Sequence, residues 1–241
     1  MKKIIIVLLF ALPFSTLSQN LDFGLSGGGV LSSQSLTTES LSNAVGVDWN
    51  SIGGLPYDVD PYIGYNGGVF LDLYFDLSSE EEDKTIKRNL GIRTGFNYSS
   101  QGVIVEDVNR TRFTINQVYY QVPILIYFKV QKFNFFIGPQ LHLLQDVNTT
   151  VNKSTILSTN ATASAIENLK FEKSDYEERD TNLVFGFGYE IYNGLSIQLK
   201  SLRSIRNTSM LSDEIWKNKS LELSIFFNIN SILWQKTLIK F

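Results

Sequence analysis

The chain alternates apolar and polar residues over eight separate segments, and this pattern constrains the fold more than any other feature of the sequence. A period of two is typical of β-strands, because successive side chains of a strand point to opposite faces. In 117–129, for example, every second residue from Val118 to Phe128 is apolar or aromatic. The eight segments are 21–28, 63–75, 89–98, 117–129, 133–144, 182–191, 195–200 and 221–230.

The amino terminus has the pattern of a secretory signal peptide. Two lysines precede an apolar run of 11 residues, 4–14, and small residues follow at Thr16 and Ser18. A run of this length is too short for a membrane-spanning helix, which needs about 20 residues. We predict that 1–18 is a cleaved signal peptide; an uncleaved anchor and a buried strand are the alternatives.

Alternation alone does not separate a soluble β-sandwich or lipocalin from a membrane β-barrel, because each has one apolar and one polar face. Three features favour the membrane barrel. The apolar faces are long and rich in Phe, Leu and Ile, and the polar faces combine glycines with charges of both signs, as a narrow lumen requires. The gaps between segments are alternately long and short. No apolar run near 18 residues follows the signal peptide, so a membrane-embedded chain must form a closed barrel.

The gaps indicate the topology. Long gaps are expected at 32–59, 100–112, 146–180 and 204–219, and shorter gaps at 76–87, 130–132 and 192–194. Outer-membrane barrels that start in the periplasm have long outer loops and short inner turns in this order. We therefore predict an all-β, eight-stranded antiparallel transmembrane β-barrel, an up-and-down meander over 19–230, in the outer membrane with both termini periplasmic. The remaining residues, 231–241, are expected to form a periplasmic tail or an extension of the last strand.

Six polar residues are expected to form a network in the lumen, because strand parity places them on the polar face. An uncompensated charge is costly in a narrow lumen, so Arg93 and Lys200 are expected to pair with the carboxylates on that face. Eight strands leave an interior that side chains just fill, which predicts a plugged barrel and no open diffusion pore. The six residues are the carboxylates Asp72, Glu190 and Glu222, the cations Arg93 and Lys200, and the histidine His142.

Three short stretches combine aromatic and β-branched residues with glycine or proline, namely 122–128 (VPILIYF), 136–140 (FIGPQ) and 184–190 (VFGFGYE). They resemble the small outer-membrane β-barrel proteins of Bacteroidota, the PorT-like group, whose architecture is similar to that of the OmpA and OmpX barrels. The resemblance covers about 21–230. It implies an accessory or structural subunit of an outer-membrane complex, such as the type IX secretion or barrel-assembly machinery. The family shares no catalytic residues that carry over to this chain.

The composition excludes several kinds of active site. The chain has no cysteine and one histidine, His142, which excludes thiolate zinc sites, cysteine nucleophiles and multi-histidine metal sites. A net charge of −3 argues against a nucleic-acid binder. We expect a non-enzymatic protein without catalytic residues, metal or cofactor. The alternative is a lipid-modifying barrel hydrolase that uses His142, with Ser224 or Glu222 nearby.

Three tryptophans are the candidate contacts for a partner protein, because large aromatic residues dominate many interfaces. Trp49 and Trp216 fall in expected loops and Trp234 in the tail. Packing of the loops over the barrel mouth is the alternative role for the first two. The expected partners are the lipopolysaccharide and phospholipid of the outer membrane and other outer-membrane proteins. A stand-alone envelope or adhesion barrel and a soluble lipocalin-type carrier are the alternatives to a complex subunit.

Overall fold

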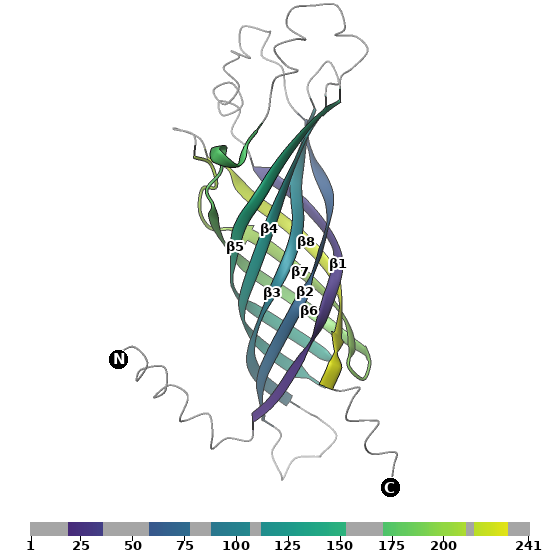
Figure 1. Cartoon of the computed structure of the whole chain (residues 1–241). Helices are drawn as coiled ribbons and strands as arrows, with labels where there is room; N and C mark the ends of the chain where they lie inside the picture. The colour runs from purple at the N-terminus through teal and green to yellow at the C-terminus, as the bar shows by residue number, and fades with distance from the viewer. Residues whose placement is uncertain are drawn as a thin grey trace, which may run out of the picture.

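The computed structural model describes residues 19–35, 58–77, 88–106, 112–152, 171–210 and 215–230. Within these ranges eight strands form one closed barrel (Figure 1). No helix in the described ranges is long and apolar enough to cross a membrane. The elements are β1 (Gln19–Ser35), β2 (Asp58–Asp76), β3 (Arg88–Glu106), β4 (Arg112–Val130), β5 (Phe133–Asn152), the short 3₁₀ helix η3 (Lys173–Asp175), β6 (Arg179–Tyr192), β7 (Leu195–Ser204) and β8 (Lys217–Asn228).

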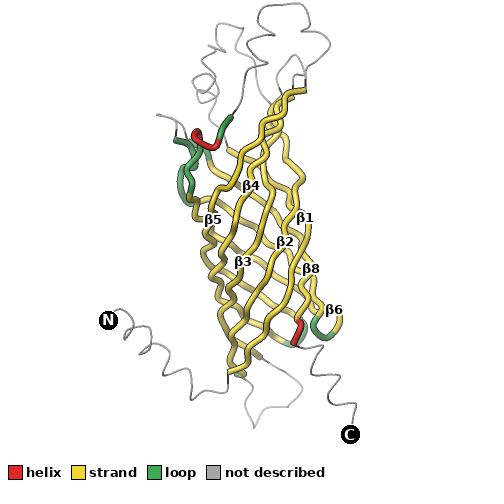
Figure 2. Tube along the Cα trace, in the orientation of Figure 1, coloured by secondary structure: helices red, strands yellow, loops and turns green. Residues whose placement is uncertain are grey.

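Each strand runs antiparallel to the next one in the chain, and β8 closes the barrel against β1. Two-residue turns join β4 to β5 and β6 to β7, and Gly194 in the second turn has a φ of 81°, which favours glycine. We call the end of the barrel with these turns the turn end and the opposite end the loop end (Figure 2). The closed eight-stranded meander confirms the predicted fold class.

The strands differ in length around the barrel. β2, β3 and β4 have 19 residues each and β5 has 20, whereas β6, β7 and β8 have 14, 10 and 12. The long strands therefore project beyond the short ones at the loop end, as Figure 1 shows.

The projecting parts correct two of the predicted gaps. The gap 100–112 is wrong over most of its length, because β3 and β4 are separated by 107–111 alone. β5 also continues to Asn152, beyond the predicted strand end. Toward the loop end of β3, the positions that continue the outer face are Ser100 and Gly102, whereas the inner positions become apolar at Val103 and Val105. The polar–apolar contrast between the two faces is therefore lost, and with it the alternation that marks a strand.

The barrel is apolar outside and polar inside, which is the reverse of a soluble protein. Outward-facing Phe185 and Leu223 are 58% and 56% exposed. Inward-facing Arg93 and Glu222 are 5% and 0% exposed. Apolar surface is unfavourable in water by about 25 cal/mol per Å², so this wall belongs in lipid. The burial pattern contradicts the lipocalin alternative, in which the apolar face would line the interior.

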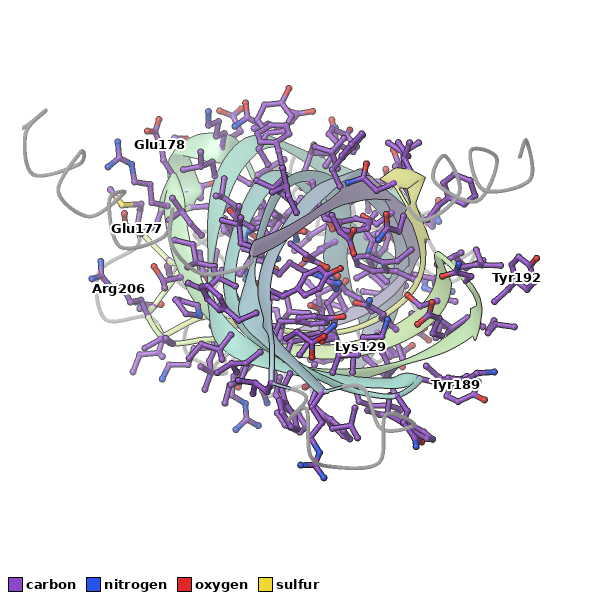
Figure 3. All side chains as sticks on the ribbon, turned by 90° about the horizontal axis from the view of Figure 1, so that it is seen from below. Lys129, Glu177, Glu178, Tyr189, Tyr192 and Arg206 are labelled. Atoms are coloured by element: carbon purple, nitrogen blue, oxygen red, sulfur yellow. The ribbon has the colours of Figure 1, made fainter. Side chains whose placement is uncertain are left out.

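Aromatic side chains lie at both edges of the apolar wall. Near the turn end the rings of Phe133 and Tyr189 meet edge to face, with centroids 5.1 Å apart, and Figure 3 shows Tyr189 pointing away from the barrel. Toward the loop end, Tyr98 lies 6.1 Å from Tyr65 and 6.2 Å from Tyr120 between ring centroids. We call these three the outer tyrosines. Aromatic girdles of this kind are typical of the two membrane–water interfaces.

Candidate functional site

Arg93 of β3 lies at the centre of the lumen. It is directly opposite Asp72 of β2 in the strand register. Its Nε and Nη2 donate to the two carboxylate oxygens of Asp72, each at 2.7 Å. Its Nη1 donates to Oε1 of Gln198 on β7, also at 2.7 Å. Bidentate pairs of this kind are among the strongest side-chain interactions, so Arg93 ties three strands together across the lumen.

Four aromatic rings surround the guanidinium of Arg93, and we call them the aromatic cage. They come from β2, β4, β5 and β8, so the cage spans the whole width of the barrel. Each ring attracts the cation through its negative face. The distances from Cζ to the ring centroids are 5.1 Å for Phe70, 5.0 Å for Tyr127, 5.8 Å for Phe136 and 4.8 Å for Phe226.

Two glycines provide the space that the aromatic cage occupies. A Cβ added at Gly186 would collide first with the ring of Phe136, and a Cβ added at Gly24 would collide with the backbone oxygen of Phe227 and with the ring of Phe70. Both glycines were placed on the polar face by the alternation. Their role is therefore to admit large rings to a narrow lumen.

A second ion pair lies nearer the loop end. Lys200 of β7 and Glu222 of β8 are opposite each other in the register, with 2.5 Å between Nζ and Oε2. The same oxygen accepts a hydrogen bond of 3.0 Å from Nδ2 of Asn66, whose Oδ1 accepts one of 3.1 Å from Ser224. The prediction that Arg93 and Lys200 pair with carboxylates of the polar face is thus confirmed.

Glu190 belongs to a third ion pair, at the turn end. Its Oε2 lies 2.5 Å from Nζ of Lys129, and Figure 3 shows Lys129 within the opening of the barrel. A cavity of about 220 Å³ is found here, with Asp22 and Tyr74 in its lining and Arg93 at its inner limit. Lys129 was not included in the predicted network, although its parity places it on the inner face.

His142 lies on the inner face of β5 and is 0% exposed. Its Nε2 is 3.0 Å from Nε2 of Gln140, and its ring centroid is 5.3 Å from that of Tyr119. Asp180 is its neighbour on β6, but the Asp180 carboxylate accepts its short hydrogen bond, of 2.6 Å, from Ser204. Among the described residues no hydroxyl group hydrogen-bonds to His142. The geometry therefore brings no nucleophile to this histidine.

The two residues considered as partners of His142 are engaged elsewhere. Ser224 donates to Asn66, and Glu222 pairs with Lys200. The predicted polar network is thus divided into separate groups: one around Arg93, one around Lys200, one at Lys129 and one around His142. In the described structure, no hydrogen bond or ion pair joins Glu190 or His142 to the central pair of Arg93 and Asp72.

Above the polar lumen, an apolar cluster fills the loop end, and we call it the mouth cluster. Its strand residues lie on the projecting parts of β3, β4 and β5, and its remaining members follow β5 or precede β8. Sequence reasoning missed it, although Val103 and Val105 continue the inner-face parity of one predicted strand, and Phe113 and Ile115 that of the next. The buried members are Val103, Val105, Phe113, Ile115, Tyr119, Leu144, Val147, Phe171, Tyr176 and Trp216.

Trp216 is the largest residue of the mouth cluster and is 1% exposed. Its ring centroid lies 5.7 Å from that of Phe171 and 5.0 Å from that of Tyr176. Its contacts therefore match the alternative role for this tryptophan, which packs the loops over the barrel mouth. Trp49 and Trp234 lie outside the described residues, as do the predicted signal peptide 1–18 and the tail 231–241.

From the turn end to the loop end, the described lumen contains in turn an ion pair, a caged arginine, a second ion pair, a histidine group and an apolar cluster. Side chains of these groups fill the described lumen from above the cavity at the turn end to the loop end. The described residues contain no group of three or more His, Cys, Asp or Glu side chains that could hold a metal ion.

A family model described as "Outer membrane protein beta-barrel domain" matches residues 17–209. The chain belongs to this family. The match agrees with the closed barrel and its apolar wall, and it makes the protein an outer-membrane β-barrel. None of the curated proteins matches the chain significantly.

Solved structures similar to this outer-membrane barrel include neisserial surface protein A, with 7% identity and a TM-score of 0.43 over 87% of this chain and 99% of that one. Ail of Yersinia pestis, solved with the heparin analogue sucrose octasulfate, has 12% identity and a TM-score of 0.38 over 87% and 99%. OprG of Pseudomonas aeruginosa has 13% identity and a TM-score of 0.30 over 88% and 95%. Likeness at this level does not extend to function.

Proposed function

We propose that this protein is a non-enzymatic outer-membrane barrel that acts as an accessory or structural subunit of an outer-membrane complex. The filled lumen is the main support for this proposal. Arg93 and its aromatic cage close the centre of the barrel, and the mouth cluster closes the loop end. A barrel whose described lumen is filled by side chains is expected to act through its outer wall, its loops and its termini.

The proposed orientation places the loop end outside the cell and both termini in the periplasm. Two-residue turns lie at the end where β1 begins, and short turns face the periplasm in outer-membrane barrels. The resemblance of 122–128, 136–140 and 184–190 to the PorT-like group of Bacteroidota supports a role in type IX secretion or barrel assembly. Trp49 and Trp234 remain the candidate contacts with partner proteins.

The native size of the protein tests this proposal. A tagged copy is extracted gently from outer membranes, its particle size is measured, and its co-purifying proteins are identified. The expected result is a particle of several hundred kilodaltons with a fixed set of partners. In the variant Trp49→Ala or Trp234→Ala, the particle should be smaller and should contain fewer partner proteins. A small particle of the size of one barrel in detergent, without partners, would overturn the subunit role.

That second result would favour a stand-alone envelope or adhesion barrel. The projection of β3–β5 beyond the short strands, with the mouth cluster packed inside it, supports this alternative. A recognition surface requires a well-packed base of this kind.

A further inference from the structure

The loop-end edge of the apolar wall differs between two sides of the barrel. On β2, β3 and β4 the edge carries the outer tyrosines. On β7 and β8 it carries three exposed cations, Arg203, Lys217 and Lys219, which we call the basic edge.

The strand register brings these cations together. Arg203 and Lys219 lie directly opposite each other on β7 and β8. Lys217 precedes Lys219 by two residues on the same face of β8, and it lies opposite Ser35 of β1. Like charges placed directly opposite on neighbouring strands repel each other. Within the described part of the chain, no salt bridge to a carboxylate compensates any of the three.

The surroundings of the basic edge are amphiphilic. The outward-facing neighbours of Arg203 and Lys219 on the adjoining strands are a leucine of β6 and a serine of β1. One step toward the turn end, the wall becomes apolar, and Leu31 and Leu221 are 44% and 43% exposed. These neighbours in the described strands are Leu31, Ser33, Ser35, Leu183, Ser201 and Leu221.

We infer that the basic edge is a binding site for the phosphate groups of a phosphorylated glycolipid in the outer leaflet. The guanidinium of Arg203 suits bidentate contact with a phosphate, and the ammonium groups of Lys217 and Lys219 add charge beside it. The acyl chains of the same lipid lie along the leucines below. An anion here removes the repulsion between Arg203 and Lys219. The inference rests on the proposed orientation, because that orientation places the basic edge in the outer leaflet.

Lipid retention by the purified full-length protein tests the site. The protein is exchanged into detergent with diphosphorylated lipid A, dephosphorylated lipid A or phosphatidylglycerol, and bound lipid is counted by native mass spectrometry. The test variant is the double substitution Arg203→Gln with Lys219→Gln. The matched control is Arg112→Gln with Lys132→Gln, which removes the same charge from exposed positions at the two ends of β4, four strands away from β8.

The wild type and the control are expected to retain diphosphorylated lipid A, and the test variant to bind it about thirtyfold more weakly, as the loss of two interfacial cations implies. Equal retention by the wild type and the test variant would overturn the site. Equal retention of dephosphorylated lipid A would overturn the role of the phosphates. Phosphatidylglycerol bound as tightly as lipid A would overturn the assignment to a glycolipid. Heat-modifiable migration on gels verifies that both variants fold.

A separate measurement distinguishes failure of the site from failure of the orientation. The chain has no cysteine, so Lys173→Cys introduces a unique thiol at the loop end. Labelling of intact cells by an impermeant maleimide is expected if the loop end faces outward. Lack of labelling in cells, with labelling after lysis, would contradict the orientation. The retention result does not depend on the orientation, because it is measured on the purified protein.

Discussion

The middle of the lumen and its loop end are filled by different kinds of side chain. In its middle, where eight strands surround it, the interior is charged: Arg93 with Asp72 and Lys200 with Glu222. At the loop end, where β3–β5 project beyond β6–β8, the interior is apolar and includes Trp216. The completeness of the ring of strands therefore determines which kind of interaction fills the lumen. A complete ring supplies a fixed partner for each charge, whereas an incomplete ring relies on apolar packing to hold the connections over the opening.

The largest effect is expected from Arg93→Met, which leaves the buried carboxylate of Asp72 without its cation. Removing one member of a buried ion pair typically costs about 3–5 kcal/mol. The free energy of unfolding, measured by urea titration of the protein in lipid vesicles, should fall by this amount. The double variant Asp72→Leu with Arg93→Met is the control, because an apolar pair of similar volume is often neutral. Equal losses in the single and double variants would show that the charge itself is not what matters here.

Trp216→Ala is expected to lower the free energy of opening the mouth cluster by about 3 kcal/mol. The free energy of unfolding of the whole barrel should not change. Hydrogen exchange at the amides of Leu144 and Thr208, which donate to Glu178 and Trp216, should become about a hundredfold faster. Amides of the middle of the barrel should be unchanged, and Trp216→Phe should show a smaller effect. Uniform acceleration along all strands would contradict a separable mouth.

A smaller effect is expected from Gly186→Val, which places a side chain against the ring of Phe136. Overpacking of this kind costs about 1–3 kcal/mol. Gly29→Val is the matched control, because a Cβ at Gly29 meets nothing within 4 Å. Urea titration of the two variants should therefore give different free energies of unfolding. Equal values would indicate that the aromatic cage can shift to make room.

Much of this architecture is contained in the alternation. Strand parity placed Asp72, Arg93, Lys200 and Glu222 on one face, and the closure of eight strands then required them to be inside. Parity does not specify which carboxylate meets which cation, because the partner depends on the register between strands. The pairing of Glu190 with Lys129, and not with Arg93, is a consequence of that register.

The mouth cluster was less accessible to sequence reasoning for a different reason. Its members come from three strands and two connections that are far apart in the chain. Trp216 has no periodic pattern around it that would mark it as buried. Its environment arises only when the connections after β5 and before β8 fold over the projecting strands, and local sequence does not carry that information.

Conductance across a planar bilayer tests most directly whether the lumen is closed, both at the caged Arg93 and at the mouth cluster. The purified full-length protein is inserted into the bilayer, and single-channel currents are recorded over a range of voltages. No stable conductance steps of porin size are expected, because Arg93 with its aromatic cage and the mouth cluster fill the described lumen. Sustained, uniform steps of that size from the wild-type protein would show that the lumen is open.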